Sequence, residues 1–356
     1  YRTYSYCGQE LAAKITQARI FLQRENIRKG DKVILLGHNS IEWVIVYLAC
    51  ILSGVIVVPL DVQTNKALLQ RIQKQVRAKA LFSEKGLAAF KPKSYQLQTY
   101  FLDELENSLK EIKSARLTAA AVKSIDILQI VYTSGTTGEP KGVILTYENM
   151  VTGIRSACNA VPLKLPLRLL NLLPLSHIFG QVYGLFLPLH FGHQLFFLDS
   201  LQPRKIISFI RNKRIHGAVM IPGLVAALKK ALEGTSLRWN LGSQFRLLGV
   251  GGAALDSTVE KWWKRHFVLV VQGYGLTETA AVVSANKPFA SKIGSAGRIA
   301  EGVEIKLDSD GEILVRGKNV TPGYYRDAKK TAQSFTDSWF RTGDIGEIKK
   351  GYLYIK

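Results

Sequence analysis

Short apolar runs alternate with longer amphipathic stretches over the first 283 residues, and this alternation constrains the fold more than any other feature of the sequence. Helices are predicted over Ile41–Ser53, Lys66–Val76, Arg204–Arg211 and Leu224–Leu232. Runs with the length of strands lie at Val33–Leu36, Val55–Leu60, Ala80–Ser83, Ile127–Tyr132, Leu169–Leu173, Gln194–Leu198, Ala218–Ile221, Phe245–Val250 and Val268–Gly273. This pattern predicts an α/β fold with parallel sheets covered by helices on both faces.

The sequence pattern changes after Val283, where Gly, Pro and Asp separate shorter predicted strands. These are predicted at Glu304–Leu307, Glu312–Arg316, Gly346–Lys349 and Tyr352–Ile355. Such spacing is typical of a small antiparallel or barrel-like unit. We therefore predict two helix-covered, mostly parallel β-sheet subdomains over residues 1–283 and a small β-barrel-like subdomain over residues 284–356.

Composition narrows the class of protein. With 356 residues, 47% of them hydrophobic, the chain is globular. Its three cysteines, Cys7, Cys50 and Cys158, form no Cys-x-x-Cys pair, which favours a reducing cytoplasm and argues against structural zinc. The formal charge of +21 attracts polyanions, but the basic residues are spread along the chain and no nucleic-acid module accompanies them. No nucleic acid is expected as a partner. The same field would steer ATP, CoA or anionic lipid, so peripheral membrane contact is a second expectation.

Residues 43–60 carry no charge and reach the length of a membrane-spanning helix. Gly54 and Pro59 interrupt that run, however, and Asn39-Ser40 is placed to cap a helix that would end near Ser53. A helix, a turn and a buried strand of an α/β fold therefore explain the segment better than a membrane span.

The segment from Tyr132 to Gly142 (YTSGTTGEPKG) follows a predicted buried strand and holds three glycines, four Ser or Thr residues and Lys141. Glycines let backbone N–H groups turn toward an anion, hydroxyls add donors, and lysine supplies a mobile charge, so the segment predicts a phosphate-binding loop. The spacing differs from the Walker loop because Gly142 follows the lysine. The alternative is a solvated turn between a strand and a helix.

This loop resembles that of the adenylate-forming superfamily, which includes acyl-CoA synthetases, adenylation domains and luciferases. Three further blocks match in order, at Gly249–Leu255, Gly273–Thr279 and Trp339–Gly346, and Gly54–Asp61 resembles the family's early strand. The resemblance implies that residues 1–356 are the large N-terminal domain of an AMP-binding enzyme similar to fatty acid–CoA ligases. The sequence stops where the family's hinge and smaller C-terminal domain would begin, so a longer full-length protein is expected.

The resemblance also implies an activity. A carboxylic acid would react with ATP to give an acyl-adenylate and pyrophosphate, and the acyl group would then pass to CoA or to a carrier thiol. Amino-acid-activating members carry an aspartate near His177, and none occurs between Leu172 and Leu189, so a non-amino acid is expected. The apolar stretch Ile178–Leu189 favours a medium- to long-chain fatty acid, although these residues would equally suit an ordinary core.

Site residues follow from the matched blocks. The resemblance assigns the ATP phosphates to Thr133, Ser134, Gly135, Thr136, Thr137, Gly138 and Lys141, and the adenine pocket to Gly251, Gly252, Ala253, Gly273, Tyr274 and Gly275. It assigns Thr277 to the α-phosphate, Glu278 to Mg²⁺ and His177 to the neighbourhood of the substrate carboxylate. Lys141, His177, Thr277 and Glu278 would be the catalytic residues. Asp344 would accept both ribose hydroxyls, and Ser338 departs from the family pattern, which has glycine there.

Other interpretations remain open. Within the superfamily the chain could be an acyl-AMP ligase or an aryl-acid ligase. Gly249-x-Gly251-x-x-Ala254 also fits the dinucleotide fingerprint of an NAD-dependent oxidoreductase, although Val268–Val271 lies where the ribose-binding acid should be. A non-catalytic nucleotide- or lipid-binding module is the third alternative. Locally, Thr277 and Glu278 would suit a helix cap, and His177 would suit a buried core histidine.

Overall fold

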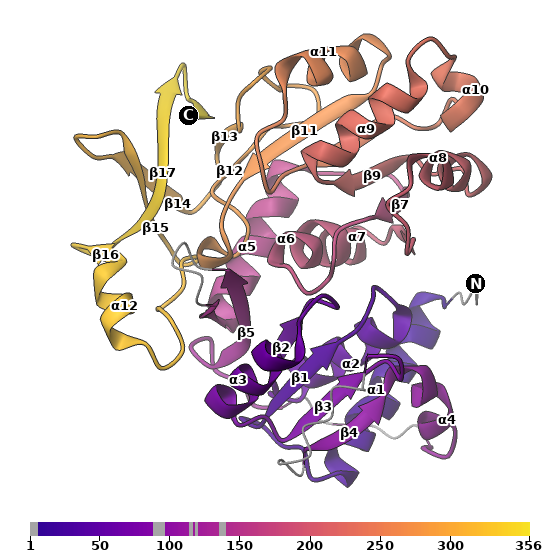
Figure 1. The fold of residues 1–356 in the computed structure, drawn as a ribbon, viewed down its shortest axis with the longest axis vertical. Helices are drawn as coiled ribbons and strands as arrows, with labels where there is room; N and C mark the ends of the chain where they lie inside the picture. Colours follow the sequence, from indigo (N-terminus) through magenta and orange to yellow (C-terminus); the bar gives the residue numbers. More distant parts are fainter. Residues whose placement is uncertain (1–5, 88–96, 114–116, 118–119, 135–139) are drawn as a thin grey trace. The chain divides into compact units, whose positions relative to one another are not determined.

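The computed structural model describes residues 6–87, 97–113, 117, 120–134 and 140–356 (Figure 1). The chain divides into two compact units, with the boundary after Tyr147. Two sheets are mostly parallel and a third is antiparallel, which confirms the predicted α/β class with an added β-rich part.

The first unit is built on a six-stranded sheet in the order β4-β3-β1-β2-β5-β6. Its strands are β1 Lys32–Leu36, β2 Ile56–Leu60, β3 Ala80–Ser83, β4 Gln98–Phe101, β5 Ile127–Ser134 and β6 Pro140–Thr146. Its helices are α1 Gly8–Arg24, α2 Ile41–Leu52, α3 Lys66–Val76, the short η2 Leu102–Glu104 and α4 Leu105–Lys110. All neighbouring strands pair in parallel except β6, which is antiparallel to β5.

The uncharged run is a buried helix followed by a strand, as predicted. Ser40 begins α2, where its hydroxyl accepts a hydrogen bond from the backbone N–H of Trp43 at 3.1 Å. The helix is buried from Trp43 to Ile51, and β2 is buried along its whole length. Among the described residues, no helix is both long and apolar enough to cross a membrane.

The second unit contains a seven-stranded sheet in the order β13-β12-β11-β10-β9-β7-β8. Its strands are β7 Arg168–Asn171, β8 Gln194–Phe197, β9 Gly217–Met220, β10 Leu247–Val250, β11 Leu269–Tyr274, β12 Ser284–Ala285 and β13 Arg298–Ile299. Its helical elements are α5 Tyr147–Ala160, α6 Ile178–Gln181, η3 Val182–Phe186, α7 Leu187–His190, α8 Pro203–Asn212, α9 Pro222–Leu232, α10 Leu237–Leu241, α11 Ser257–Arg265 and η4 Thr277–Thr279. Strands β7 to β11 are parallel, and β12 and β13 add antiparallel strands at one edge.

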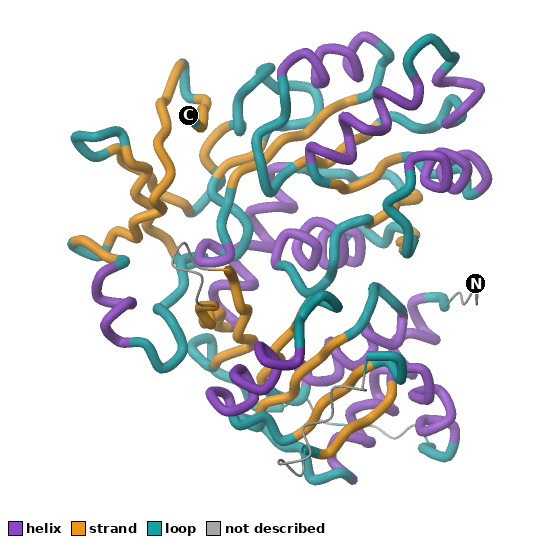
Figure 2. The backbone as a smooth tube through the Cα atoms, viewed as in Figure 1, coloured by secondary structure: helices purple, strands orange, loops and turns teal. Residues whose placement is uncertain are grey.

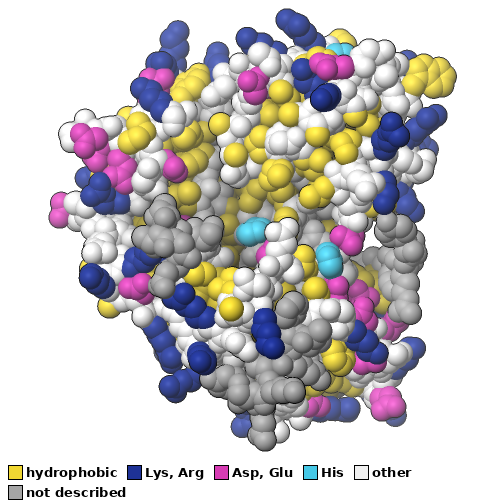
Figure 3. Space-filling view, viewed as in Figure 1, with side chains coloured by type: hydrophobic (Ala, Val, Ile, Leu, Met, Phe, Trp, Pro, Cys, Tyr) yellow, Lys and Arg dark blue, Asp and Glu magenta, His cyan; other side chains and the backbone are white. Residues whose placement is uncertain are grey.

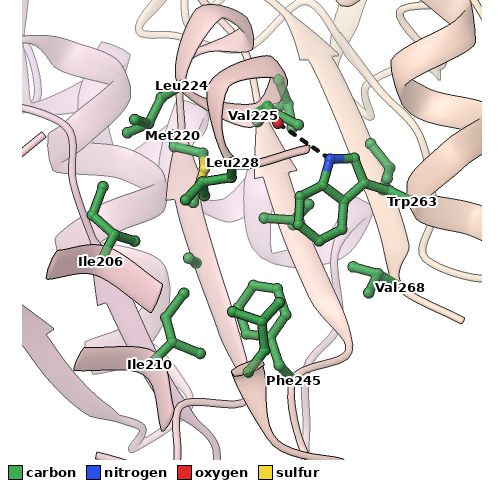
Figure 4. Close-up of a cluster of buried hydrophobic side chains, with 14 of the residues drawn as sticks. Ile206, Ile210, Met220, Leu224, Val225, Leu228, Phe245, Trp263 and Val268 are labelled. Atoms are coloured by element: carbon green, nitrogen blue, oxygen red, sulfur yellow. Dashed lines mark hydrogen bonds between the residues drawn. The ribbon is translucent and has the colours of Figure 1, made fainter. Parts of the chain in front are cut away.

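Side-chain alternation gives the two faces of this sheet different partners. Leu248 and Val270 point into a core made with α8, α9 and α11, where Trp263 donates its indole N–H to the Val225 carbonyl at 3.3 Å (Figure 4). Their neighbours Leu247 and Val271 instead line a cavity on the opposite face. Figures 1 and 2 show α6 and α7 on that opposite side from α9 and α11.

The third sheet is antiparallel and runs β14-β15-β17-β16, with β18 paired to β17. Its elements are β14 Val303–Leu307, β15 Glu312–Gly317, α12 Ala328–Gln333, β16 Phe335–Thr336, β17 Trp339–Lys349 and β18 Tyr352–Ile355. Strands β16 and β17 are joined by the two residues Asp337 and Ser338, whose φ angles of 47° and 67° are both positive. Two-residue hairpins of this kind favour Asp-Gly, which explains why glycine would suit position 338 better than serine.

Several sequence-based boundaries need correction. The predicted strand ending at Tyr132 continues to Ser134, and β6 follows as a strand. The alternative interpretation is therefore wrong in placing a helix directly after this segment, and residues 135–139 within it lie outside the described residues. Other elements had not been predicted from the sequence, among them α1, β4, α5 and α11. Lys and Arg side chains are scattered over the face seen in Figure 3 and form no single patch there, in agreement with their spread along the sequence.

Candidate functional site

The ends of the predicted phosphate loop lie in a β-hairpin of the first unit. Thr133 in β5 pairs with Lys141 in β6, and Tyr132 pairs with Gly142. A Cβ on Gly142 would lie 3.1 Å from Cζ of the Tyr132 ring, whose hydroxyl donates to Oε1 of Gln75 at 2.8 Å. Tyr132 and Gly142 therefore pack to fix the base of the hairpin. Gly135, Thr136, Thr137 and Gly138 lie outside the described residues, and Ser134 is described only as the last residue of β5.

The remaining predicted site residues belong to the second unit. Gly251, Gly252 and Ala253 follow the carboxyl end of β10, and Gly252 has a φ of 83°. A Cβ on Gly251 would approach Cζ of the Phe179 ring to 2.7 Å. Gly251 is therefore required by a close approach within the protein itself, besides any role toward adenine.

The segment Gly273–Glu278 continues β11 into the single turn η4. Gly275 has a strict steric requirement, because a Cβ there would lie 2.3 Å from the backbone of Ala281. Thr277 is half-buried at the start of η4, and the next residue, Glu278, accepts a hydrogen bond from the Tyr324 hydroxyl at 2.9 Å. The backbone N–H of Thr321 donates to the Glu278 carbonyl at 2.7 Å. Thr277 and Glu278 thus lie in a fixed short turn rather than at the start of a long helix.

A buried asparagine holds this turn from behind. The Asn319 side chain is fully buried and donates to the Thr279 carbonyl at 3.0 Å and to the Val282 carbonyl at 2.7 Å. Ala280 and Ala281 between them have φ angles of 48° and 67°, a conformation that alanine rarely adopts. Asn319 therefore stabilises an otherwise strained loop directly after Glu278.

Asp344 lies in a bulge of β17. From the pair Leu314↔Arg341 to the pair Glu312↔Ile345, β17 advances by four residues while β15 advances by only two. Bulges of this kind re-aim side chains, and here the Asp344 carboxylate accepts a hydrogen bond from the Tyr274 hydroxyl at 2.7 Å. Burial, followed by the hydrogen bond to Asp344, raises the pKa of the Tyr274 phenol, so it remains a proton donor to this carboxylate.

Glu312 organises the bulge. This buried carboxylate accepts the backbone N–H of Gly343 at 2.8 Å and Nε of Arg341 at 2.9 Å, and it also pairs with Nη2 of Arg341. The Thr342 hydroxyl donates to the Ile313 carbonyl at 2.7 Å and accepts the Asp344 N–H at 3.1 Å. The Thr-Gly-Asp sequence is thus fixed on both sides, which leaves Asp344 beside Tyr274.

His177 is exposed at the N-cap of α6, with φ −102° and ψ 141°. The alternative interpretation of His177 as a buried core histidine is therefore wrong. The helical stretch that follows contains the π turn η3, and Pro188 one turn later explains it, because proline cannot donate to the carbonyl four residues before it.

An apolar cavity of about 40 Å³ lies between this helical stretch and the sheet. Its wall is formed by Val161, Leu163, Leu169, Phe179, Tyr183, Leu187, Ala218, Val219, Leu247, Gly249, Val250, Val271, Gly273 and Ala285. Gly273, which lines the cavity, directly precedes Tyr274 in the sequence, and Tyr274 is the hydrogen-bond partner of Asp344. The apolar stretch Ile178–Leu189 was predicted to suit an acyl chain, and three of its residues, Phe179, Tyr183 and Leu187, line the cavity.

Three residues with a part in this arrangement were missed from the sequence: Glu312, Asn319 and Tyr324. Each acts on a partner more than twenty residues away, and none lies in a matched block. No group of three or more Asp, Glu, His or Cys side chains able to hold a metal ion occurs in the described part of the chain.

Comparison with known proteins decides the family. The sequence model described as "AMP-binding enzyme" matches residues 1–325. The chain belongs to the AMP-binding enzyme family. It is 28% identical to the long-chain-fatty-acid–CoA ligase FadD15 of Mycobacterium bovis, over 97% of this chain and 68% of that protein. It is 31% identical to the 2-succinylbenzoate–CoA ligase of Bacillus licheniformis, over 96% of this chain and 72% of that protein.

A solved structure of a related enzyme has a fold similar to that of this chain. The o-succinylbenzoate CoA synthetase (MenE) from Bacillus subtilis, in complex with ATP and magnesium ion, superposes with a TM-score of 0.83 at 28% identity. The superposition covers 98% of this chain and 73% of that one. These relatives support adenylate-forming acid–CoA ligase chemistry with ATP, Mg²⁺ and CoA, and they differ in the acid, which is a fatty acid in one and 2-succinylbenzoate in the others.

Proposed function

We propose that this AMP-binding enzyme activates a carboxylic acid with an apolar body, first to an acyl-adenylate and then, in the full-length protein, to a CoA thioester. One observation carries the proposal. The Tyr274 hydroxyl and the Asp344 carboxylate, 70 residues apart in sequence, are joined at 2.7 Å directly beyond Gly273, which lines the apolar cavity. A nucleotide site and an acid site would thus share the end of β11.

For the nucleotide, Tyr274 with Gly251, Gly252, Ala253, Gly273 and Gly275 would receive adenine, and Asp344 would accept the ribose hydroxyls. An ionised carboxylate offers about four acceptor positions, so the bond from Tyr274 leaves room for two hydroxyl donors. Thr277 would contact the α-phosphate. Thr133, Ser134, Gly135, Thr136, Thr137, Gly138 and Lys141 would bind the leaving pyrophosphate.

Glu278 would be the protein ligand for Mg²⁺. The absence of any larger acidic cluster among the described residues fits this ion, because Mg²⁺ commonly takes only one or two carboxylates and completes its shell with phosphate and water. When bound, the ion supplies positive charge to the phosphates. Tyr324 would fix the Glu278 carboxylate through one oxygen and leave the other side of the carboxylate to face the ligand.

The reaction requires positioning rather than a covalent intermediate with the protein. A carboxylate oxygen of the acid attacks the α-phosphorus of ATP, the bond from that phosphorus to the bridging oxygen breaks, and pyrophosphate leaves with the electron pair. His177, exposed at the start of α6, would lie beside the acid carboxylate, and Lys141 would neutralise the pyrophosphate.

For the acid, we propose a fatty acid of medium or longer chain, whose apolar body would contact the apolar wall of the cavity. An aryl acid is the second candidate, because the 2-succinylbenzoate–CoA ligases are as similar to this chain as the fatty acid ligases are. We further propose the predicted division into subdomains over residues 1–283 and 284–356, with a smaller C-terminal domain completing the full-length enzyme.

The test is acid-dependent exchange of pyrophosphate into ATP by the full-length protein, with a panel of fatty, aryl and amino acids. We expect exchange with fatty or aryl acids and none with amino acids. Glu278→Gln should raise the Mg²⁺ concentration needed for half-maximal exchange, whereas Glu233→Gln, which alters an exposed glutamate paired with Lys229, should not. Binding of ATP without exchange on any acid would favour a non-catalytic module, and tighter binding of NAD than of ATP would favour an oxidoreductase.

A further inference from the structure

The wall of the cavity on the α6 side of the sheet includes one side chain with a polar group, that of Tyr183. Tyr183 lines the cavity, yet its hydroxyl oxygen is closed off from water and has no hydrogen-bond partner among the described residues. An unpaired buried hydroxyl is costly, and phenylalanine would fill the same space without that cost. The hydroxyl therefore suggests a partner that arrives with the ligand.

The local fold holds the Tyr183 ring against the cavity. Phe179, Tyr183 and Leu187 are spaced four residues apart, and in a regular α-helix such side chains drift by about 40° per step. The wider π turn at Val182–Phe186 reduces that drift, so all three face the cavity. The Phe179 ring meets the Tyr183 ring edge-on, with centroids 5.1 Å apart.

The Tyr183 hydroxyl lies close to the strand that leads to the nucleotide residues. A Cβ built on Gly273 would lie 3.8 Å from the hydroxyl oxygen, so the absence of a side chain at Gly273 leaves space beside it. Burial, and to a lesser extent the nearby Cys158 thiol, raises the pKa of the Tyr183 phenol, which therefore remains protonated and able to donate.

We infer that Tyr183 determines acid specificity by donating a hydrogen bond to a neutral oxygen, such as that of a ketone, ether or hydroxyl group, within the apolar body of the acid. The acceptor is neutral because none of the residues that line the cavity carries a cationic side chain, and a second carboxylate placed there would be an unpaired charge. This inference rests on the proposed acid activation and names its substrate class as oxygenated, otherwise apolar acids.

The test compares acids in matched pairs with the full-length protein. A series of fatty acids with a ketone at successive chain positions is assayed for pyrophosphate release, each against the unsubstituted acid of equal length, together with an alkoxybenzoate against the matching alkylbenzoate. For wild type, we expect at least one oxygenated acid to have a kcat/KM about tenfold above its unsubstituted partner. Tyr183→Phe should bring that ratio close to one by lowering kcat/KM for the oxygenated acid alone.

Tyr352→Phe is the matched control, because it also removes a tyrosine hydroxyl, one that donates to the Ala290 carbonyl at 3.1 Å outside the cavity, and should leave the ratio unchanged. Tyr183→Phe should also be at least as stable as wild type without ligand, since it deletes an unpaired group. A ratio equal in Tyr183→Phe and wild type, or a clear loss of stability, would overturn the inference. Activity on no acid at all would instead overturn the proposed function.

Discussion

Replacing Asn319 offers the sharpest test of how the fold supports the Glu278 turn. This fully buried amide donates to the carbonyls of Thr279 and Val282 at 3.0 and 2.7 Å, and both carbonyls belong to the loop that follows Glu278. Asn319→Ala removes both donors at once. Water cannot replace these donors without entering the core. The Thr279 carbonyl keeps the backbone N–H of Val282 at 3.1 Å, whereas the Val282 carbonyl loses the bond from Asn319.

The expected cost follows from these two bonds. A neutral hydrogen bond contributes about 0.5–1.5 kcal/mol to stability, so two give about 1–3 kcal/mol. For a unit of this size that corresponds to a melting temperature lower by about 2–4 °C per kcal/mol. Asn319→Asp should be worse than Asn319→Ala, because a carboxylate would be buried against two carbonyl oxygens that both repel it.

Asn240→Ala provides a matched control. Its side-chain amide also makes two hydrogen bonds, to the Thr235 hydroxyl at 3.1 Å and the Ser236 carbonyl at 3.0 Å, but Asn240 is only partly buried and water can reach both partners, Thr235 and Ser236, which are exposed. We expect a cost below about 0.5 kcal/mol there, as for most surface substitutions. Unfolding by heat and by urea gives the stability of each variant, and pyrophosphate exchange against Mg²⁺ concentration reports on Glu278. The reasoning is refuted if Asn319→Ala is no less stable than Asn240→Ala, or if Asn319→Asp is the most stable of the three.

Four further outcomes are expected. Ser338→Gly should stabilise the protein by about 0.5–1 kcal/mol in urea unfolding, because glycine adopts the φ of 67° without the strain that serine carries; a lower midpoint would contradict this. Gly275→Ala should destabilise by about 1–3 kcal/mol because its Cβ would meet the Ala281 backbone at 2.3 Å, whereas Gly223→Ala, with nothing within 4 Å, should be neutral within about 0.5 kcal/mol. Burial lowers the pKa of both His193 and His216 from 6.5, and Arg168 and Arg214 lower that of His216 further, so the folded state binds fewer protons than the unfolded state. Their contribution to stability should therefore be complete above about pH 6.5 and be lost as the pH falls below it, and His193→Gln should flatten that slope in unfolding measured between pH 5 and 8. Lys141→Ala should raise the KM for ATP about tenfold in pyrophosphate exchange while leaving the melting temperature near that of wild type, and an unchanged KM would remove Lys141 from the phosphate site.

The sequence predicted the inner parallel strands of both sheets closely because buried strands are continuous apolar runs. Val33–Leu36 and Ala80–Ser83 differ by at most one residue from β1 and β3. Strand β6 was missed for the opposite reason. It begins with Pro140, Lys141 and Gly142, whose composition is that of a loop, and only its pairing with β5 makes that stretch a strand.

The residues that support the candidate site could not be predicted from local sequence patterns. Asn319 acts on Thr279 across 40 residues, and Tyr324 acts on Glu278 across 46, so no spacing rule connects either pair. Their only signal is chemical, since a polar side chain next to buried strands needs a partner. Buried Glu260 is a comparable case. It lies on α11 and accepts a hydrogen bond at 2.7 Å from Gln272, the residue that precedes Gly273. Its other oxygen forms an ion pair with Nζ of Lys264 at 2.7 Å.

The two candidate carboxylates share one arrangement, and it explains why tyrosine is used at both positions. Tyr274 donates to Asp344 at 2.7 Å and Tyr324 donates to Glu278 at 2.9 Å. Burial raises the pKa of both phenols, and the carboxylates they contact raise it further, so each tyrosine supplies a fixed donor without adding charge. An arginine or lysine would orient the same carboxylates but would neutralise them, and a neutralised Glu278 would attract Mg²⁺ less strongly. A tyrosine phenol therefore fixes the carboxylate side chain, and the carboxylate keeps its negative charge for the ligand.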